Sequence, residues 1–131
     1  MTERQLRYLP DEQIRSCLDM KKAIELMKEA FIQISARTVT IPVRTGISTS
    51  DGKGRTLFMP SYSPQLSAFG VKVVSVFPEN DKKGLPVIQG KLLVLDGQTG
   101  TPTAMLDAEY LTALRTGAAS GLASDCLAIK E

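Results

Sequence analysis

The hydrophobic pattern of the chain changes period twice, from helical to strand-like and back to helical. In residues 19–36, apolar side chains recur three and four positions apart, with lysines and glutamates between them. This spacing predicts an amphipathic helix that Asp19 caps at its N-terminus. Asp11 is placed to cap a shorter helical turn before it.

Short β-rich runs separated by turn residues follow, and they occupy residues 39–48, 55–63, 67–77, 87–96 and 103–107. Parallel neighbours need crossovers of about a dozen residues or more, so the short connections predict antiparallel pairing. Asp107 is then expected to cap a final helix over residues 108–128. We expect one domain over residues 1–131 with an α+β fold, in which helices flank an antiparallel, barrel-like sheet.

Composition narrows the class of protein. The 16 basic and 14 acidic residues are scattered and give a net charge of only +2, which argues against a nucleic-acid surface. No stretch approaches the roughly 18 apolar residues that span a membrane. The start, MTERQLRYLPDEQ, is too polar for a signal peptide. We therefore expect a cytoplasmic protein without a membrane partner.

Several kinds of chemistry are excluded. The chain has no histidine, which removes Ser-His-Asp and Cys-His catalysis and most zinc sites. Cys17 and Cys126 match no metal spacing, so we expect reduced thiols and no metal ligands. The DGKG and DGQTG segments do not follow a strand and open a helix, as phosphate-binding loops do, and are interpreted as turns.

Arg115 is a charge within an apolar helical stripe. Three apolar residues of the final predicted helix share its face: Leu111, Ala118 and Leu122. Gly117 and Gly121 follow it, and a helical glycine costs about 1 kcal/mol relative to alanine. Such a cost indicates close approach of another backbone or of a ligand. The structural alternative is that Arg115 snorkels or pairs with a buried carboxylate.

Two further cations stand in strands. Lys72 shares a strand face with Val74 and Val76, where it is either functional or a device of an edge strand against aggregation. Arg44 alone is most simply a surface residue. If these strands face the helix of Arg115, however, the three cations could converge on one carboxylate, which a bidentate arginine and a second cation bind well.

Three stretches resemble the N-terminal domain of the ornithine cyclodeaminase/mu-crystallin family: RTLFMPSY, FGVKVVSVFPEN and GLPVIQGKLLVLDGQTGTPTAMLDAEYLTALRTGAASGLAS. The resemblance covers nearly the whole chain. It implies NAD(P)-dependent chemistry on amino or imino acids, namely ornithine cyclodeamination, alanine dehydrogenation, or reduction of cyclic imines and ketimines. It also implies a substrate-binding and dimerisation domain that forms a homodimer through its sheets.

The resemblance further implies that Arg44, Lys72 and Arg115 hold the substrate carboxylate and that Met59 lines the same pocket. Two positions depart from the family pattern. Leu57 stands where the cyclodeaminases have a glutamate that holds the distal amine of ornithine, and Val87 stands where they have a threonine near the nicotinamide. Leucine cannot pair with an ammonium, so we expect a smaller or more apolar amino or imino acid than ornithine.

The family's Rossmann domain, with its GxGxxG loop and catalytic aspartate, has no counterpart in this sequence. We expect the chain to be the substrate-binding part of such an oxidoreductase, without catalytic residues of its own, inactive alone and unable to bind NAD or NADP alone. One alternative is a non-catalytic module that binds a carboxylate ligand. Another is a truncated remnant that exposes apolar surface.

Overall fold

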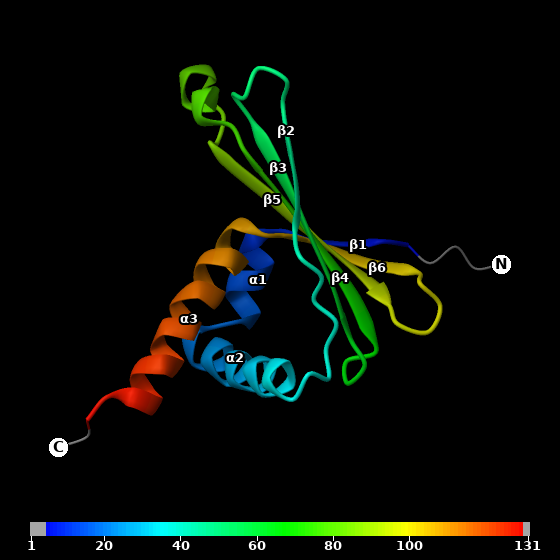
Figure 1. Cartoon of the computed structure of the whole chain (residues 1–131), viewed down its shortest axis with the longest axis vertical. Helices are drawn as coiled ribbons and strands as arrows, with labels where there is room; N and C mark the ends of the chain where they lie inside the picture. The colour runs from blue at the N-terminus through cyan, green and yellow to red at the C-terminus, as the bar shows by residue number, and fades with distance from the viewer. Residues whose placement is uncertain (1–4, 130–131) are drawn as a thin grey trace.

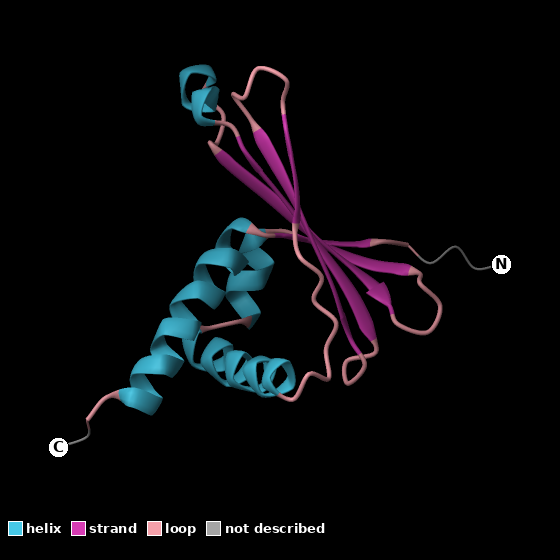
Figure 2. Cartoon of the chain, in the orientation of Figure 1, coloured by secondary structure: helices cyan, strands magenta, loops and turns pink. Residues whose placement is uncertain are grey.

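The computed structural model describes residues 5–129, which form a twisted sheet with three helices on one face (Figure 1, Figure 2). The helices are α1 (Asp11–Cys17), α2 (Met20–Ser35) and α3 (Glu109–Leu127), together with a short 3-10 helix, η1 (Pro78–Lys83). The strands are β1 (Arg7–Leu9), β2 (Thr45–Ser48), β3 (Arg55–Ser63), β4 (Ala68–Val76), β5 (Ile88–Asp96) and β6 (Pro102–Asp107). The predicted α+β class with flanking helices is confirmed.

The sheet is open and mixed, with the strand order β1-β6-β5-β4-β3-β2. From β2 to β6, successive strands pair antiparallel, as their short connections predict. The sheet differs from the predicted one because β1 pairs parallel with β6 and because β1 and β2 remain separate edges instead of closing towards a barrel. With three residues, β1 is too short for an alternating pattern to reveal it.

The strand register decides which side chains face the helices. Met59, Lys72 and Leu92 are cross-strand neighbours on β3, β4 and β5, so they share one face. The chain entering α3 meets that face at Gly90, whose carbonyl accepts from the Ala108 N–H at 3.1 Å. A Cβ added at Gly90 would lie 3.3 Å from the Ala108 Cβ. The glycine thus lets α3 begin directly against the sheet.

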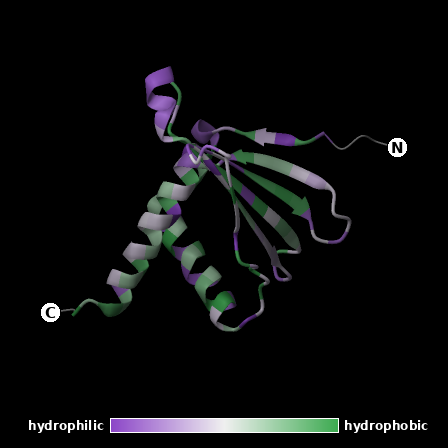
Figure 3. Ribbon diagram, turned by 45° about the horizontal axis from the view of Figure 1, so that its top comes forward, coloured by the Kyte–Doolittle hydropathy of each residue, from purple (hydrophilic) through white to green (hydrophobic). Residues whose placement is uncertain are grey.

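The opposite face of the sheet is covered by none of the helices α1–α3 (Figure 1). We call it the open sheet face, and the register assigns to it Val71, Val73, Leu93, Leu95 and Met105. In Figure 3 the deepest hydrophobic colouring includes segments of the strands, whereas η1 is hydrophilic. The sheet therefore carries a group of apolar side chains on a side that the chain's own helices leave uncovered, next to Ser75, Gln89 and Lys91 on the same face.

Helix α3 packs along α2 through small residues. Ala23 of α2 and Leu114 and Ala118 of α3 form a buried cluster, in which Ala118 has no exposed surface. A Cβ added at Gly121 would lie 3.0 Å from the Cδ1 atom of Ile24, so α2 makes the close approach that the glycines predict. Within residues 5–129 no large side chain is fully buried, and the core is correspondingly small.

The two acids expected to cap the first helices behave differently. Asp19 caps α2 as predicted, because its carboxylate accepts from the Lys22 backbone N–H at 2.8 Å. Asp11 does not cap α1: it is the first residue of that helix, and Pro10 holds the cap position without a side-chain hydrogen bond. Asp11 instead places a negative charge in the first turn, where the helix dipole favours it.

Asp107 does not cap α3 either, because it ends β6 and Ala108 holds the cap position. Its carboxylate accepts from the Tyr8 hydroxyl at 2.8 Å and from the Asp11 backbone N–H at 3.2 Å, and it pairs with Lys91. Hydrogen bonds from Lys91 and then from Tyr8 hold the pKa of Asp107 below its usual value. One carboxylate thus ties β1 and α1 to the sheet.

Candidate functional site

Lys72 lies in β4, an interior strand, so it is not a device that protects a sheet edge. The register places it between Met59 on β3 and Leu92 on β5. Its side chain reaches α3, where the Nζ atom donates to the Thr112 hydroxyl at 3.5 Å. The strand thus presents a half-buried cation to the first turns of the helix.

Arg115 comes one turn after Thr112 on α3, and its charge reaches Lys72. Burial first, and then the charge of Arg115, hold the pKa of the Lys72 ammonium below its usual value. The prediction that Arg115 lies inside the apolar stripe is wrong, because its side chain is exposed while Leu114 and Ala118 are buried. Helix α2 covers the face of Leu114 and Ala118, and Arg115 lies beside that face.

Neither of these cations has a carboxylate partner within residues 5–129. The ion pairs in this range are Lys22–Glu25, Lys82–Glu79 and Lys91–Asp107. A buried carboxylate partner for Arg115, one of the two structural alternatives, is therefore not found there, whereas its exposure agrees with the other, a snorkelling side chain. Two like charges close together repel each other, and a bound anion would relieve this repulsion.

The structure places Met59 next to Lys72, and within the described residues it shows no such contact for Arg44. Met59 is the direct neighbour of Lys72 across the strands. Arg44 is exposed and precedes β2, whose first residue, Thr45, pairs with Phe58 beside Met59. No hydrogen bond or ion pair in the described part of the chain joins Arg44 to the other two cations. Its place in a carboxylate site stays a prediction.

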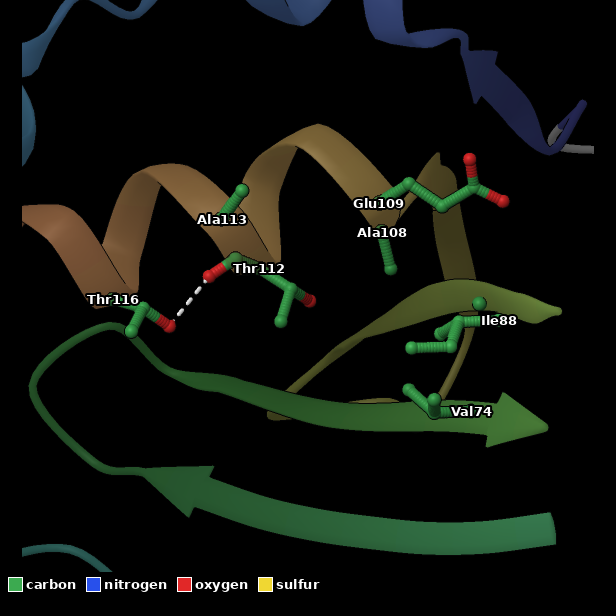
Figure 4. A pocket seen from close by; sticks show the side chains of 8 residues that line it. Val74, Ile88, Ala108, Glu109, Thr112, Ala113 and Thr116 are labelled. Atoms are coloured by element: carbon green, nitrogen blue, oxygen red, sulfur yellow. Dashed lines mark hydrogen bonds between the residues drawn. The ribbon is translucent and has the colours of Figure 1, made fainter. Parts of the chain in front are cut away.

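A cavity of about 510 Å³ opens between α3 and the sheet (Figure 4). Strands β4 and β5 and the start of α3 line it, with Val74, Ile88, Gly90, Ala108, Glu109, Thr112, Ala113 and Thr116. Thr112 both lines the cavity and accepts from Lys72, so the ammonium lies at its edge. In Figure 4 the Glu109 carboxylate points away from Val74 and Ile88, which leaves the wall largely apolar.

The two departures from the family pattern lie next to this cavity. Leu57 pairs with Val74 across β3 and β4, so it is on the same side of the sheet. Val87 directly precedes Ile88, and its carbonyl accepts from the Phe77 N–H at 2.9 Å. Both side chains are apolar, so neither offers a partner to a charged group of a ligand.

Sequence reasoning missed Thr112, which carries no charge and belongs to no charged pattern. The available signal is its place three residues before Arg115, because positions i and i+3 are neighbours on a helix surface. Thr112 and Lys72 are 40 residues apart in sequence. The start of α3 at Gly90 brings them together, and the sequence pattern does not encode that contact.

Other kinds of site find little support in residues 5–129. This range contains no group of three His, Cys, Asp or Glu side chains that could hold a metal ion, and the thiols of Cys17 and Cys126 are free. The DGKG and DGQTG segments connect β2 to β3 and β5 to β6, and neither opens a helix. None of the described helices is both long enough and apolar enough to cross a bilayer.

Sequence relatives include the Delta(1)-pyrroline-2-carboxylate reductase of Bacillus cereus. It is 40% identical over 114 residues, which are 87% of this chain and 35% of the relative. The Delta(1)-pyrroline-2-carboxylate reductase of Thermococcus litoralis, solved in complex with NADH and L-proline, has a TM-score of 0.87 and 40% identity. That match covers 95% of this chain and 39% of the solved one.

An archaeal alanine dehydrogenase dimer with bound NAD has a TM-score of 0.86 and 32% identity, over 95% of this chain and 38% of the other. The chain thus spans between a third and two fifths of the length of these relatives. Residues 7–131 match the ornithine cyclodeaminase/mu-crystallin family, the same family that the three sequence stretches resemble. With nearly all of its length matched and its fold shared with these enzymes, the chain belongs to the ornithine cyclodeaminase/mu-crystallin family.

Proposed function

We propose that this chain is the substrate-binding part of an NAD-dependent oxidoreductase that acts on a small amino or imino acid. One observation carries the proposal: the Lys72 ammonium reaches Thr112, which lines an apolar cavity, Arg115 follows Thr112 by three positions on α3, and neither cation has an ion-pair partner in residues 5–129. Two neighbouring cations next to an apolar space suit a ligand with a carboxylate at one end and a hydrocarbon body.

The two cations contribute different properties to carboxylate binding. A guanidinium can donate to both carboxylate oxygens in one plane, and an ammonium adds a compact charge with three donors. We propose Arg44 as a third ligand, since it precedes β2 close to Met59. Met59 would contact the body of the ligand. Together these groups would hold the α-carbon in one orientation, and such orientation accounts for much of an enzyme's rate.

The lining of the cavity favours a cyclic imine or a small apolar amino acid over ornithine. Val74 and Ile88 lie on its sheet side, with Leu57 paired to Val74. A second ammonium on the ligand would lose water there without gaining a charged partner. The similarity to Delta(1)-pyrroline-2-carboxylate reductases and to an alanine dehydrogenase supports substrates of this size.

NAD is the cofactor that we propose for the reaction, because related proteins are solved with NADH and with NAD. Within residues 5–129 no glycine-rich loop follows a strand and opens a helix, so this part of the chain does not fit a dinucleotide pyrophosphate. We therefore assign cofactor binding to protein outside the described residues and expect none by these residues alone. Free thiols and NAD chemistry both suit the cytoplasm, which is the location we propose.

We also propose that two copies of the protein associate through the open sheet face. That face carries a group of apolar side chains, and α1–α3 lie on the other side of the sheet (Figure 1). Contiguous apolar surface of this kind is typical of a protein interface. The similar alanine dehydrogenase is a dimer, which supports the proposal.

Calorimetric titration of the purified protein with pyrrole-2-carboxylate tests the carboxylate site. This planar analogue of a cyclic imino acid keeps its charge over the neutral and basic range and has no basic amine. We expect Arg115→Ala to weaken its binding by about 30-fold or more, since truncating one partner of a charged hydrogen-bonded pair commonly costs this much. Arg7→Ala, which removes an exposed arginine of β1, should leave the affinity unchanged.

The outcomes of this titration distinguish the proposed oxidoreductase from the non-catalytic binding module. Equal affinity of the Arg115→Ala and wild-type proteins would contradict the site. Binding that appears or tightens only when a cofactor-binding domain with NADH is supplied supports the oxidoreductase. Tight binding that is the same with and without a supplied cofactor-binding domain and NADH, together with no turnover, would instead support the non-catalytic binding module.

A further inference from the structure

Thr112 is the polar side chain that joins the cavity to the cationic pair. Its hydroxyl accepts from the Lys72 ammonium at 3.5 Å, and the same residue lines the cavity (Figure 4). On α3 it precedes Arg115 by three positions, so the helix presents a hydroxyl and a guanidinium side by side. Within residues 5–129, the hydrogen-bond partner of the Lys72 side chain is Thr112.

Thr112 is held in place by the start of its helix. Its backbone N–H donates to the Ala108 carbonyl at 3.0 Å, and Ala108 itself is fixed against the sheet at Gly90. Its own carbonyl accepts from the Thr116 hydroxyl at 2.7 Å, the interaction drawn in Figure 4. The backbone that carries the Thr112 hydroxyl is therefore held in place, whereas the Lys72 side chain has several rotatable bonds.

We propose that Thr112 is a positioning residue of the carboxylate site, whose hydroxyl holds the Lys72 ammonium at the edge of the cavity next to Arg115. This inference rests on the proposed function. A lysine that is already oriented loses less side-chain entropy when the ligand binds. Because the hydroxyl uses a lone pair to accept from Lys72, its own hydrogen remains available to donate to an oxygen of the bound carboxylate.

The hydrogen bond itself is tested without any ligand. The pKa of Lys72 is measured by NMR titration of its side-chain ¹³Cε signal, assigned by comparison with Lys72→Met. Thr112→Val keeps the shape of the side chain but removes the hydroxyl. Because the hydroxyl, as a hydrogen-bond acceptor, stabilises the charged form of Lys72, we expect the pKa of Lys72 to fall further in this variant. Thr112→Ser restores the hydroxyl and should return the pKa to the wild-type value.

The role in binding is tested with pyrrole-2-carboxylate on the same proteins. We expect Thr112→Val to raise the dissociation constant about tenfold, the scale of one hydrogen bond to a charged group, and Thr112→Ser to recover most of the loss. The loss of affinity at basic pH should begin at a lower pH in Thr112→Val than in the wild-type protein. Ser120→Ala, which removes a hydroxyl that donates to the Thr116 carbonyl on an exposed part of α3, is the matched control.

Each result decides the inference. A lowered Lys72 pKa together with weakened binding in Thr112→Val, both recovered in Thr112→Ser, supports it. Unchanged affinity in Thr112→Val, while Arg115→Ala still weakens binding, overturns the positioning role and leaves the proposed function intact. If the wild-type protein binds no carboxylate at any pH, with or without NADH, both the proposed function and the positioning role are rejected.

Discussion

At the scale of single residues, the binding role proposed for Lys72 and the stability of the fold make opposite demands on one side chain. The ammonium is half-buried, and Arg115 adds a second positive charge to its surroundings. Both effects disfavour the charged form of the lysine in the folded protein. A site that attracts an anion is therefore expected to be less stable when no anion is bound.

Replacing Lys72 by methionine should raise the free energy of unfolding at neutral pH. Below the lowered pKa of the native state, Lys72 is charged in both the folded and the unfolded chain, so its full cost is present. That cost falls as pH rises through the lowered pKa towards 10.5, where the native lysine has become neutral. The gain from Lys72→Met should therefore shrink at basic pH.

Urea denaturation of both proteins at neutral pH and near pH 10, without ligand, measures this difference. Lys28→Met removes an exposed lysine of α2 and serves as the control. A Lys72→Met protein that is less stable than wild type at neutral pH would show that packing of the lysine stem, rather than its charge, dominates. The same variant should lose carboxylate binding, which separates its effect on stability from its effect on the site.

At the scale of elements, the carboxylate of Asp107 determines how the N-terminal segment joins the sheet. It connects Tyr8 of β1, the first backbone N–H of α1 and Lys91 of β5. β1 has only three residues and occupies an edge, so its own ladder is short. The position of α1 over the sheet therefore depends in part on a single charged side chain.

Asp107→Ala should destabilise the protein by about 1–2 kcal/mol at neutral pH, the scale of hydrogen bonds to a charged group, reduced by solvent around the half-exposed Lys91. The folded state lowers the pKa of Asp107, so this contribution is present above the usual value of 3.8 and is lost as pH falls through the lowered one. Denaturation at pH 7 and at acidic pH checks the prediction. A destabilisation that stays constant with pH would contradict the electrostatic explanation.

The helices and strands also differ in how well they can be predicted from the sequence. Helical and strand periods located α2, α3 and the strands β3 to β6, because those segments repeat their pattern over more residues. β2, with four exposed residues, lies at the end of the longer run predicted over residues 39–48. β1 escaped prediction since three residues carry no period. Asp107 is predicted as a helix cap because capping depends on local sequence, whereas its actual partners lie 16, 96 and 99 residues away.

The candidate site, too, could be predicted from the sequence only in part. Arg44, Lys72, Met59 and Arg115 were singled out from the sequence, as cations in unusual places and by resemblance to the family. The register places Met59 beside Lys72, and the Lys72 ammonium reaches Thr112, three positions before Arg115 on α3. The exposure of Arg115 and the contact between Lys72 and Thr112 both depend on which side of α3 packs on α2, and periodicity alone does not fix this.

At the scale of the whole molecule, the small core has a consequence for how stability should be measured. The chain exposes 9568 Å², whereas a compact monomer of 14.2 kDa exposes about 6,800 Å². The difference exceeds the roughly 1,600 Å² that a standard protein interface buries. Much of the surface that would stabilise an ordinary domain of this size is thus available only to association.

Stability should accordingly obey mass action. If copies associate through the open sheet face, the thermal midpoint of this chain will rise with protein concentration, because each tenfold increase adds about 1.4 kcal/mol to the free energy of an associated dimer. Scanning calorimetry over two decades of concentration should show a rise of several degrees. A flat midpoint would contradict association and would mean that this open architecture is held together by its sheet and by three helices packed through alanines.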